Sequence, residues 1–187
     1  MTDAVVSTTA SAGDKVLETD RLILRLLVAD DAPFILELVN DPDWLRYIGD
    51  KGVRNLDDAR AYIRNGPMAM YARVGFGLFR VELKAGGTPI GMCGLIKRET
   101  LPDVDIGFAF LPQFRAHGYG REAARATLDY GRDIVGLKRI IAITSPDNDA
   151  SGRLLEAVGL RFERSFDISA EDRSVRLYGW TAQPSAG

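Results

Sequence analysis

The chain has 187 residues, a formal net charge of −2, one cysteine and one histidine. A chain of this length suits one domain with a core of ordinary size, so we expect a flexible tail over residues 1–14 and a single domain over residues 15–187. The near-neutral charge gives no overall attraction to nucleic acid or to an acidic membrane, and neither is expected as a partner. Because no apolar run approaches the roughly 20 residues of a membrane helix and no apolar signal core opens the chain, we expect a cytoplasmic protein.

The single cysteine and the single histidine restrict the chemistry further. Cys93 falls within the apolar run 90–96, which predicts a buried small hydrophobe rather than a nucleophile. His117 alone cannot form the usual His/Cys metal clusters, so no metal is expected. Cysteine-protease chemistry and Ser-His-Asp hydrolysis through a G-x-S-x-G elbow are both poorly supported.

The first half of the chain alternates short apolar and helical patterns. Residues 21–28 predict a strand, and Asp30-Asp31 with Pro33 then opens a helix that runs to about Val39. Residues 40–54 are typical of a loop, and a second helix is predicted over residues 56–64. The apolar runs 76–83 and 90–96, separated by Lys-Ala-Gly-Gly-Thr-Pro, predict an antiparallel hairpin.

The second half of the chain continues with a strand over residues 104–111. An amphipathic pattern predicts a helix over residues 119–135. The remaining expected elements are a strand over 139–144, a turn over 145–148, a short helix over 149–158 and a final antiparallel pair of strands over 160–168 and 174–180.

The glycine-rich segment Arg115-Ala116-His117-Gly118-Tyr119-Gly120 lies between a predicted strand and a predicted helix. A glycine loop that opens a helix leaves free backbone N–H groups at the positive end of the helix dipole. Such a loop is suited to binding a phosphate group. The sequence therefore places the chemistry at this loop.

Other interpretations of the same loop are open. Gly118-x-Gly120-x-x-Ala123 also fits the dinucleotide fingerprint, with Asp147 a little over twenty residues further on. The elements before the loop, a strand, two helices and a hairpin, disfavour the doubly wound fold that this fingerprint requires. No Walker loop occurs in the chain. A third interpretation is a simple strand-to-helix turn, in which the glycines serve backbone geometry only.

The loop and several other segments resemble the GNAT superfamily of N-acetyltransferases, in the style of its Rim-type ribosomal-protein N-terminal acetyltransferases. Arg115, Gly118 and Gly120 match the acetyl-CoA signature [RQ]-x-x-G-x-[GA]. Further matches are Leu17-Glu18-Thr19-Asp20-Arg21-Leu22, the strand from Asp105 to Pro112, Asn148-Asp149-Ala150-Ser151 and the stretch from Leu155 to Phe162. The resemblance covers about residues 17–180. It implies an α/β fold of the α+β type, with one mixed, mostly antiparallel sheet of about six to seven strands flanked by about four helices.

The resemblance also implies acetyl-CoA as co-substrate and a set of residues that bind it. The pyrophosphate is assigned to the backbones of His117, Gly118, Tyr119, Gly120 and Arg121. Arg115 and Arg121 can add cationic donors, and His117 is expected to be a loop filler or phosphate neighbour rather than a catalyst. The pantetheine arm is assigned to the backbone around Phe108, Phe110 and Leu111, where a splayed strand would leave groups free to pair.

Acetyl transfer needs an uncharged amine, a polarised thioester carbonyl and a proton for the departing thiolate. Asp105 occupies the strand position where many relatives carry a glutamate, and is our candidate base. Aspartate is one methylene shorter, and the alternative is that Asp105 is an exposed strand residue without a role, as Asp103 in the preceding turn is expected to be. Asn148 and Ser151 match the family's N-x-x-S element, in which both residues contact the cofactor. Alternatively, Ser151 caps the short helix and Asn148 the turn.

The helix that follows Ser151 lacks the tyrosine that many GNAT enzymes use as the acid, because Arg153, Leu154 and Leu155 occupy that stretch. Ser151 is therefore our candidate acid. We expect the acceptor pocket to be lined by residues 40–64 and the final hairpin, with Trp44, Tyr47 and Trp180 as wall residues. Five acidic residues could favour a cationic acceptor or serve as caps: Asp41, Asp43, Asp50, Asp57 and Asp58.

The expected reaction is direct transfer of acetyl to a primary amine, either a protein N-terminus or a small molecule. The alternative is a CoA-binding sensor module without turnover. The family resemblance is compatible with a homodimer, which no residue pattern establishes.

Overall fold

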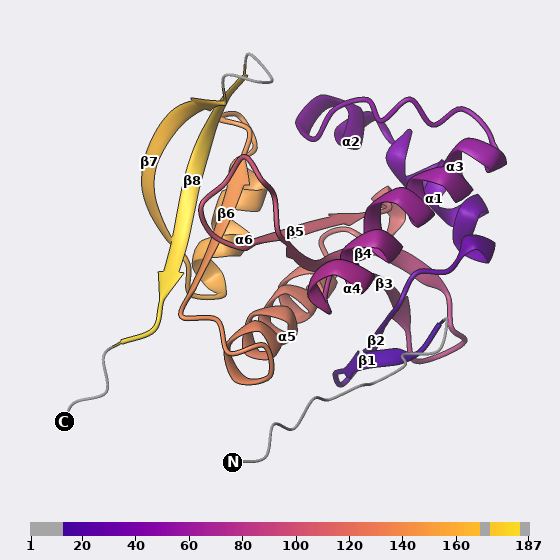
Figure 1. Cartoon of the computed structure of the whole chain (residues 1–187), viewed down its shortest axis with the longest axis horizontal. Coiled ribbons are helices and arrows are strands. Elements are labelled where there is room, and N and C mark those ends of the chain that lie inside the picture. Colours follow the sequence, from indigo (N-terminus) through magenta and orange to yellow (C-terminus); the bar gives the residue numbers. More distant parts are fainter. Residues whose placement is uncertain (1–12, 169–172, 184–187) are drawn as a thin grey trace.

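The computed structural model describes residues 13–168 and 173–183, so residues 1–12 of the expected tail lie outside the described residues. One eight-stranded sheet with the order β1-β2-β3-β4-β5-β6-β8-β7 organises this part of the chain, with β1–β2 at one end and the long β7–β8 pair at the other (Figure 1). The strands are β1 Lys15–Glu18, β2 Leu22–Arg25, β3 Leu78–Leu83, β4 Pro89–Ile96, β5 Asp105–Phe110, β6 Arg139–Thr144, β7 Arg161–Ile168 and β8 Arg173–Thr181.

The sheet is mixed and mostly antiparallel, which confirms the predicted class. Only β5 and β6 run parallel, and every other neighbouring pair is antiparallel. The strand count is higher than expected because β1 adds an eighth strand, which is too short to give a clear pattern in the sequence. A doubly wound fold needs a largely parallel sheet, so the dinucleotide interpretation of the glycine loop is wrong.

The helices are α1 Ala32–Val39, α2 Pro42–Tyr47, α3 Leu56–Ile63, α4 Ala69–Val74, α5 Tyr119–Asp133 and α6 Asp149–Ala157. Helices α2 and α4 were not predicted, and the expected loop over residues 40–54 is wrong at α2. This helix begins with a proline at its first turn, and the Asp41 side chain accepts hydrogen bonds from Asp43 N and Trp44 N. Among the described residues, every helix is too short or too polar to cross a membrane.

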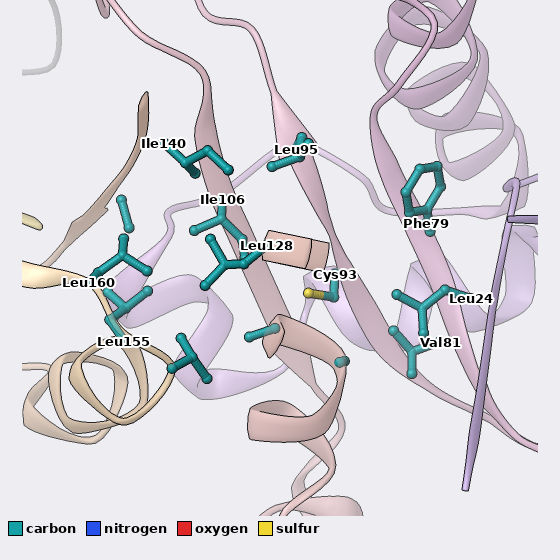
Figure 2. Packing of buried hydrophobic residues seen from close by; sticks show 14 of the residues in the cluster. Leu24, Phe79, Val81, Cys93, Leu95, Ile106, Leu128, Ile140, Leu155 and Leu160 are labelled. Atoms are coloured by element: carbon teal, nitrogen blue, oxygen red, sulfur yellow. The ribbon is translucent and has the colours of Figure 1, made fainter. Parts of the chain in front are cut away.

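Helices cover both faces of the sheet and form two hydrophobic clusters with it. Helices α5 and α6 pack against one face through residues such as Leu128 and Leu155 (Figure 2). Helices α1, α2 and α3 form the second cluster, which Met92 joins from β4. The neighbouring Cys93 points to the first cluster, where burial raises its thiol pKa to about 12. The prediction that Cys93 is a buried hydrophobe is confirmed.

An ion-pair network anchors α1 to the sheet. Asp31, only 3% exposed, precedes α1 and accepts hydrogen bonds from Arg25 on β2 at 2.7 and 3.0 Å and from Arg80 on β3 at 2.6 Å. Burial by itself opposes ionisation, but these bonds and one from Val28 N keep the pKa of Asp31 below its usual value. The two arginines thus fix the helical layer that carries α2 and α3.

We predict that Asp31→Asn lowers the free energy of unfolding at pH 7 by about 3 kcal/mol, because it leaves the two largely buried guanidinium groups of Arg25 and Arg80 with Glu82 as their one shared counter-ion among the described residues. Urea denaturation measures this loss. Since the pKa of Asp31 is depressed in the fold, its contribution exists above the unfolded pKa and disappears as the pH falls through the folded value. Asp30→Asn, at the exposed neighbouring position, is the control and should change stability little; equal effects of the two variants would contradict the prediction.

Candidate active site

Strands β5 and β6 separate to form a cleft. Their only ladder pair joins Asp105 to Ile141, and beyond it the two strands no longer pair. The resulting main cleft has a volume of about 620 Å³ and reaches from the start of α5 to α6 and α2. The splay expected from the sequence therefore exists, and it exposes backbone groups of β5 to the cleft.

The glycine loop forms one end of the main cleft. Ala116 and Gly118 have positive φ values of 62° and 81°, and Gly118 is the N-cap of α5. The first hydrogen bond of the helix runs from Glu122 N to Gly118 O at 3.0 Å, so the N–H groups of the preceding turn have no intrahelical acceptor. At Gly120 a Cβ atom would lie 3.0 Å from a terminal carbon of the Leu154 side chain, so a larger residue would crowd this part of the cleft.

The turn between β1 and β2 stabilises the loop from behind. The Glu122 carboxylate accepts hydrogen bonds from Thr19 Oγ1 at 2.6 Å and from Arg21 Nε at 2.7 Å. Arg21 also donates to the carbonyl of His117 at 3.0 Å. Although burial raises the pKa of Glu122, these bonds outweigh it and lower the pKa. The Thr19–Arg21 segment thus fixes the start of α5.

The predicted loop residues divide into two groups. Gly118, Gly120 and Arg121 line the main cleft, whereas His117 and Tyr119 are not among its lining residues and stack on each other at the outer side. Arg115 lines the cleft but is not a free cation. Its guanidinium bonds to Asp41 at 2.5 Å and to Asp43 at 2.6 Å, which ties the loop to α2.

The β5 backbone differs from the prediction at one position. Phe108 and Phe110 line the main cleft, and the Phe110 carbonyl accepts a hydrogen bond from Arg115 Nε at 2.9 Å. Leu111 is buried in the second cluster and donates its N–H to Ile90 O, so this donor is not available to a ligand. The reason is that the ladder with β4 continues to Leu111 on the side away from the cleft.

Asn148 and Ser151 both line the main cleft opposite the glycine loop. Asn148 Oδ1 accepts a hydrogen bond from Ser151 N at 3.1 Å, so Asn148 caps α6 and the suggested capping role for Ser151 is wrong. The cap uses the backbone of Ser151 and leaves its hydroxyl out of the bond.

A second pocket of about 290 Å³ lies beside the main cleft and shares the walls formed by Trp44, Tyr47 and Phe108. Asp105 lines this second pocket and is only 1% exposed, so the alternative of an exposed strand residue is wrong. Arg98 Nε donates to both carboxylate oxygens at 3.1 and 3.2 Å. Burial raises the pKa of Asp105, and the Arg98 charge partly opposes this shift.

The walls of the second pocket come from the segments expected for an acceptor pocket. Residues of α2 and α3 meet Arg173 and Val175 of β8 there. Trp180 lines neither cavity, because it lies across from Ile140 towards the other end of β8. The sequence analysis missed Tyr62 and Arg98. The hairpin register gives a signal for Arg98: Ile96 pairs with Asp105, so a residue just past β4 lies near Asp105.

The acidic residues between α1 and α3 are all used by the protein itself. Asp41 caps α2, Asp43 pairs with Arg115, and Asp50 pairs with Arg54. Asp57 pairs with Arg60, and Asp58 accepts the backbone N–H of Arg54. Their role as caps and ion-pair partners explains them. Within residues 13–168 and 173–183, the structure contains no group of three or more His, Cys, Asp or Glu side chains placed to bind a metal.

The arrangement of a splayed strand pair, a glycine loop at a helix start and a capped α6 has relatives. The sequence model of the acetyltransferase (GNAT) domain matches residues 21–161. The chain belongs to the GNAT acetyltransferase family. Its members transfer acetyl groups, so this chain is an acyltransferase, and the family uses acetyl-CoA.

Named relatives agree with this placement. The uncharacterized protein YkkB of Bacillus subtilis is 32% identical over 87% of this chain and 93% of its own, and the uncharacterized N-acetyltransferase YoaA of the same organism is 30% identical over 79% and 84%. A GNAT-family acetyltransferase crystal structure from Bacillus anthracis has a TM-score of 0.73 and 29% identity, with 88% and 97% of the chains covered. RimL, a ribosomal L7/L12 α-N-protein acetyltransferase, shares the fold, with a TM-score of 0.77, 15% identity and coverage of 90% and 94%.

The main cleft fits a cofactor with a diphosphate and an amide-rich arm. Free N–H groups at the start of α5 suit the diphosphate. Further along the cleft, Trp44 Nε1 and Thr144 Oγ1 are buried without a hydrogen-bond partner among the described residues. Buried polar atoms of this kind normally find a partner, which the amides of a pantetheine arm can supply.

We predict that Gly118→Ala weakens CoA binding by about tenfold, because a side chain at positive φ costs roughly 1–2 kcal/mol and shifts the loop amides. Isothermal titration calorimetry with CoA measures the change. Gly136→Ala is the matched control: Gly136 has a φ of 78° and no atom near its added Cβ, but lies outside both cavities. Both variants should lose similar stability in thermal melts. Equal CoA affinities for the two variants would show that the loop does not bind the cofactor.

Proposed function

We propose that this protein is an acetyl-CoA-dependent N-acetyltransferase that transfers acetyl directly to a primary amine, without an acyl-enzyme intermediate. The observation that carries the proposal is that the two cavities share lining residues. The main cleft begins at the glycine loop and shares walls with a second pocket that contains Asp105. A thioester in the main cleft and an amine in the second pocket would meet where β5 and β6 separate.

The loop is proposed to bind the diphosphate through the backbones of residues 117–121, with Arg121 as an added cation. The pantetheine arm is proposed to pair with β5 at Phe108 and Phe110 and to contact Asn148. Trp44 and Tyr47, which line both cavities, would separate the two substrates. A cytoplasmic location and a homodimer stay predictions.

The acceptor nitrogen must lose its proton before it attacks the thioester. A lysine amine of pKa about 10.4 costs roughly 4 to 5 kcal/mol to deprotonate at pH 7, whereas an α-amine of pKa near 8 costs about 1 kcal/mol. An α-amine therefore needs only a weak base. This argument favours a protein N-terminus or an amino acid over a lysine side chain.

Asp105 is proposed as the base. Its ionised carboxylate takes a proton from the ammonium form of the acceptor, and the neutral nitrogen then attacks the thioester carbon and loses its second proton to water. The C–S bond then breaks, and the departing thiolate takes a proton to give free CoA and an N-acetyl amide. A raised pKa suits this role because it brings the carboxylate closer to the pKa of the amine.

We predict that Asp105→Asn lowers kcat by roughly a hundred- to ten-thousand-fold and leaves CoA affinity unchanged. Thiol release and calorimetry measure the two quantities. Asp103→Asn is the matched control, because Asp103 pairs with Arg139 in the preceding turn. The melting temperature of Asp105→Asn at pH 7.5 should be no lower than that of the wild type, since burial of the ionised Asp105 carboxylate lowers the stability of the wild type.

The pH profile gives a second test of Asp105. Catalysis needs the ionised form, so kcat should fall as the pH decreases through a value above the usual 3.8 of aspartate. Arg98 bonds to Asp105, and Lys51 and Arg173 line the same pocket. Because Arg98 lowers the pKa of Asp105, Arg98→Met should move this acidic limb to higher pH. An unchanged limb in the variant would contradict the assignment.

Ser151 is proposed as the acid that protonates the thiolate, directly or through water, while its hydroxyl regains a proton from solvent. We predict that Ser151→Ala lowers kcat by roughly a hundredfold with little change in the melting temperature, because the cap of α6 uses only the backbone N–H of residue 151. Asn148→Ala should instead lower the melting temperature, since it removes the cap. Full kcat in Ser151→Ala would show that solvent, not Ser151, protonates the thiolate.

The acceptor class is tested with a panel of primary amines that includes peptide N-termini, amino acids, polyamines and aminoglycosides. Free thiol release with purified protein and acetyl-CoA is the readout. The Rim-type assignment predicts activity on peptide N-termini. CoA binding without thiol release from any amine would overturn the proposed function.

A further inference from the structure

The charges that line the second pocket are unusual for a site that accepts an amine. Its lining residues, as far as the structure describes them, include one carboxylate, Asp105, and the cationic side chains of Lys51, Arg98 and Arg173. Asp41 and Asp43 pair with Arg115 at the wall of the main cleft, so neither carboxylate is paired with Arg98.

Arg98 has spare hydrogen-bonding capacity on the pocket side. It uses Nε alone for Asp105, at 3.1 and 3.2 Å from the two carboxylate oxygens. Its two terminal nitrogens make no hydrogen bond to any of the residues that the structure describes, and the side chain is 35% exposed. A guanidinium with two free terminal nitrogens presents a fork that matches the two oxygens of a carboxylate.

Tyr62 on α3 adds a neutral donor to the same pocket. Burial raises the pKa of its hydroxyl to about 12, so the group keeps its proton at neutral pH. The hydroxyl has no hydrogen-bond partner within the described parts of the chain, and the Arg98 charge is close enough to affect its titration. Because Tyr62 is only partly buried and lines the pocket, its hydroxyl can donate to an acceptor group from outside.

We propose that the acceptor carries a carboxylate close to its primary amine, bound by the terminal nitrogens of Arg98 and the hydroxyl of Tyr62. This inference rests on the proposed function and names its substrate class. One guanidinium bonds to Asp105 on one side and to the substrate carboxylate on the other, so the amine that reaches Asp105 lies within a few bonds of that carboxylate. An α-amino acid satisfies this geometry, and we take the free amino acid as the source.

The test is a double-mutant cycle in which one change removes the Arg98 guanidinium and the other removes the substrate carboxylate. Each amino acid of a panel is compared with its own α-carboxamide, which keeps the amine and the side chain but loses the charge. For Arg98→Lys, which keeps the positive charge beside Asp105 but loses the fork, we expect kcat/KM to fall by about 10- to 100-fold with the amino acid and by less than threefold with the amide. Tyr62→Phe should give the same pattern with a smaller loss. Arg60→Lys, at an exposed ion pair on α3, is the matched control and should change neither substrate.

The outcomes separate the inference from the proposed function. If Arg98→Lys lowers kcat/KM equally for the amino acid and its amide, the carboxylate site is overturned while acetyl transfer stands. The same holds if the wild type has the same kcat/KM for both. If no amine releases thiol, the proposed function is overturned. A binding measurement still tests the pocket in that case: an N-acetyl amino acid should raise the melting temperature of the CoA-loaded wild type but not of Arg98→Lys.

A further experiment distinguishes two sources of the carboxylate, the α-carboxylate of a free amino acid and an acidic side chain of a peptide. Peptides with aspartate as the second residue carry an amine and a carboxylate near each other without a free α-carboxylate. If such peptides show the Arg98-dependent loss and free amino acids do not, the free amino acid is overturned as the acceptor. We expect free amino acids to show the Arg98-dependent loss and these peptides not to show it.

Discussion

The parallel pairing of β5 and β6 is limited to one point, and the two cavities depend on this limit. Asp105 faces Ile141, and Ile141 N donates to Val104 O at 3.0 Å. Beyond this contact the strands diverge, so β5 is a sheet strand on one side and an unpaired edge on the other. An unpaired edge inside a protein needs partners for its backbone groups. In this fold the main cleft supplies the space in which a ligand, rather than another strand, can be that partner.

Segments far apart in the sequence hold the walls of the cleft at their distance. The Asp41 carboxylate caps α2 and also pairs with Arg115, so the first residue of the glycine loop and the start of α2 depend on the same group. On the opposite wall, Arg46 of α2 pairs with Asp147 just before α6 at 2.8 Å, and Ser145 Oγ donates to Tyr47 O at 3.0 Å. Helix α2 thereby connects both walls of the cleft. Its position explains why Trp44 and Tyr47 line both cavities.

The sequence predicted the elements that have long patterns or strong punctuation. The β3–β4 hairpin, helix α5 and the glycine loop before it each have a signal in their own stretch of sequence, either turn residues or a helical period. Helix α2 was missed because its six residues are too few for a period, and its signals, Asp41 and Pro42, are also typical of a turn. The burial of Asp105 was equally beyond local reasoning. It depends on Arg98 and on walls from α3 and β8, which only the folded chain brings together.

The same dependence changes how the short side chain at position 105 is understood. From the sequence, an aspartate in place of a glutamate weakens the case for a base, because the carboxylate reaches less far. In the structure the carboxylate lies where β5 and β6 last pair, and Arg98, which bonds to it, also lines the second pocket. A buried ion pair rarely adds stability, since the cost of removing two charges from water offsets their attraction. The pair is better explained by position than by stability: the arginine supports the charge of Asp105 through Nε, and its terminal nitrogens make no hydrogen bond to the described residues. The shortened carboxylate and the arginine beside it are thus two parts of one arrangement.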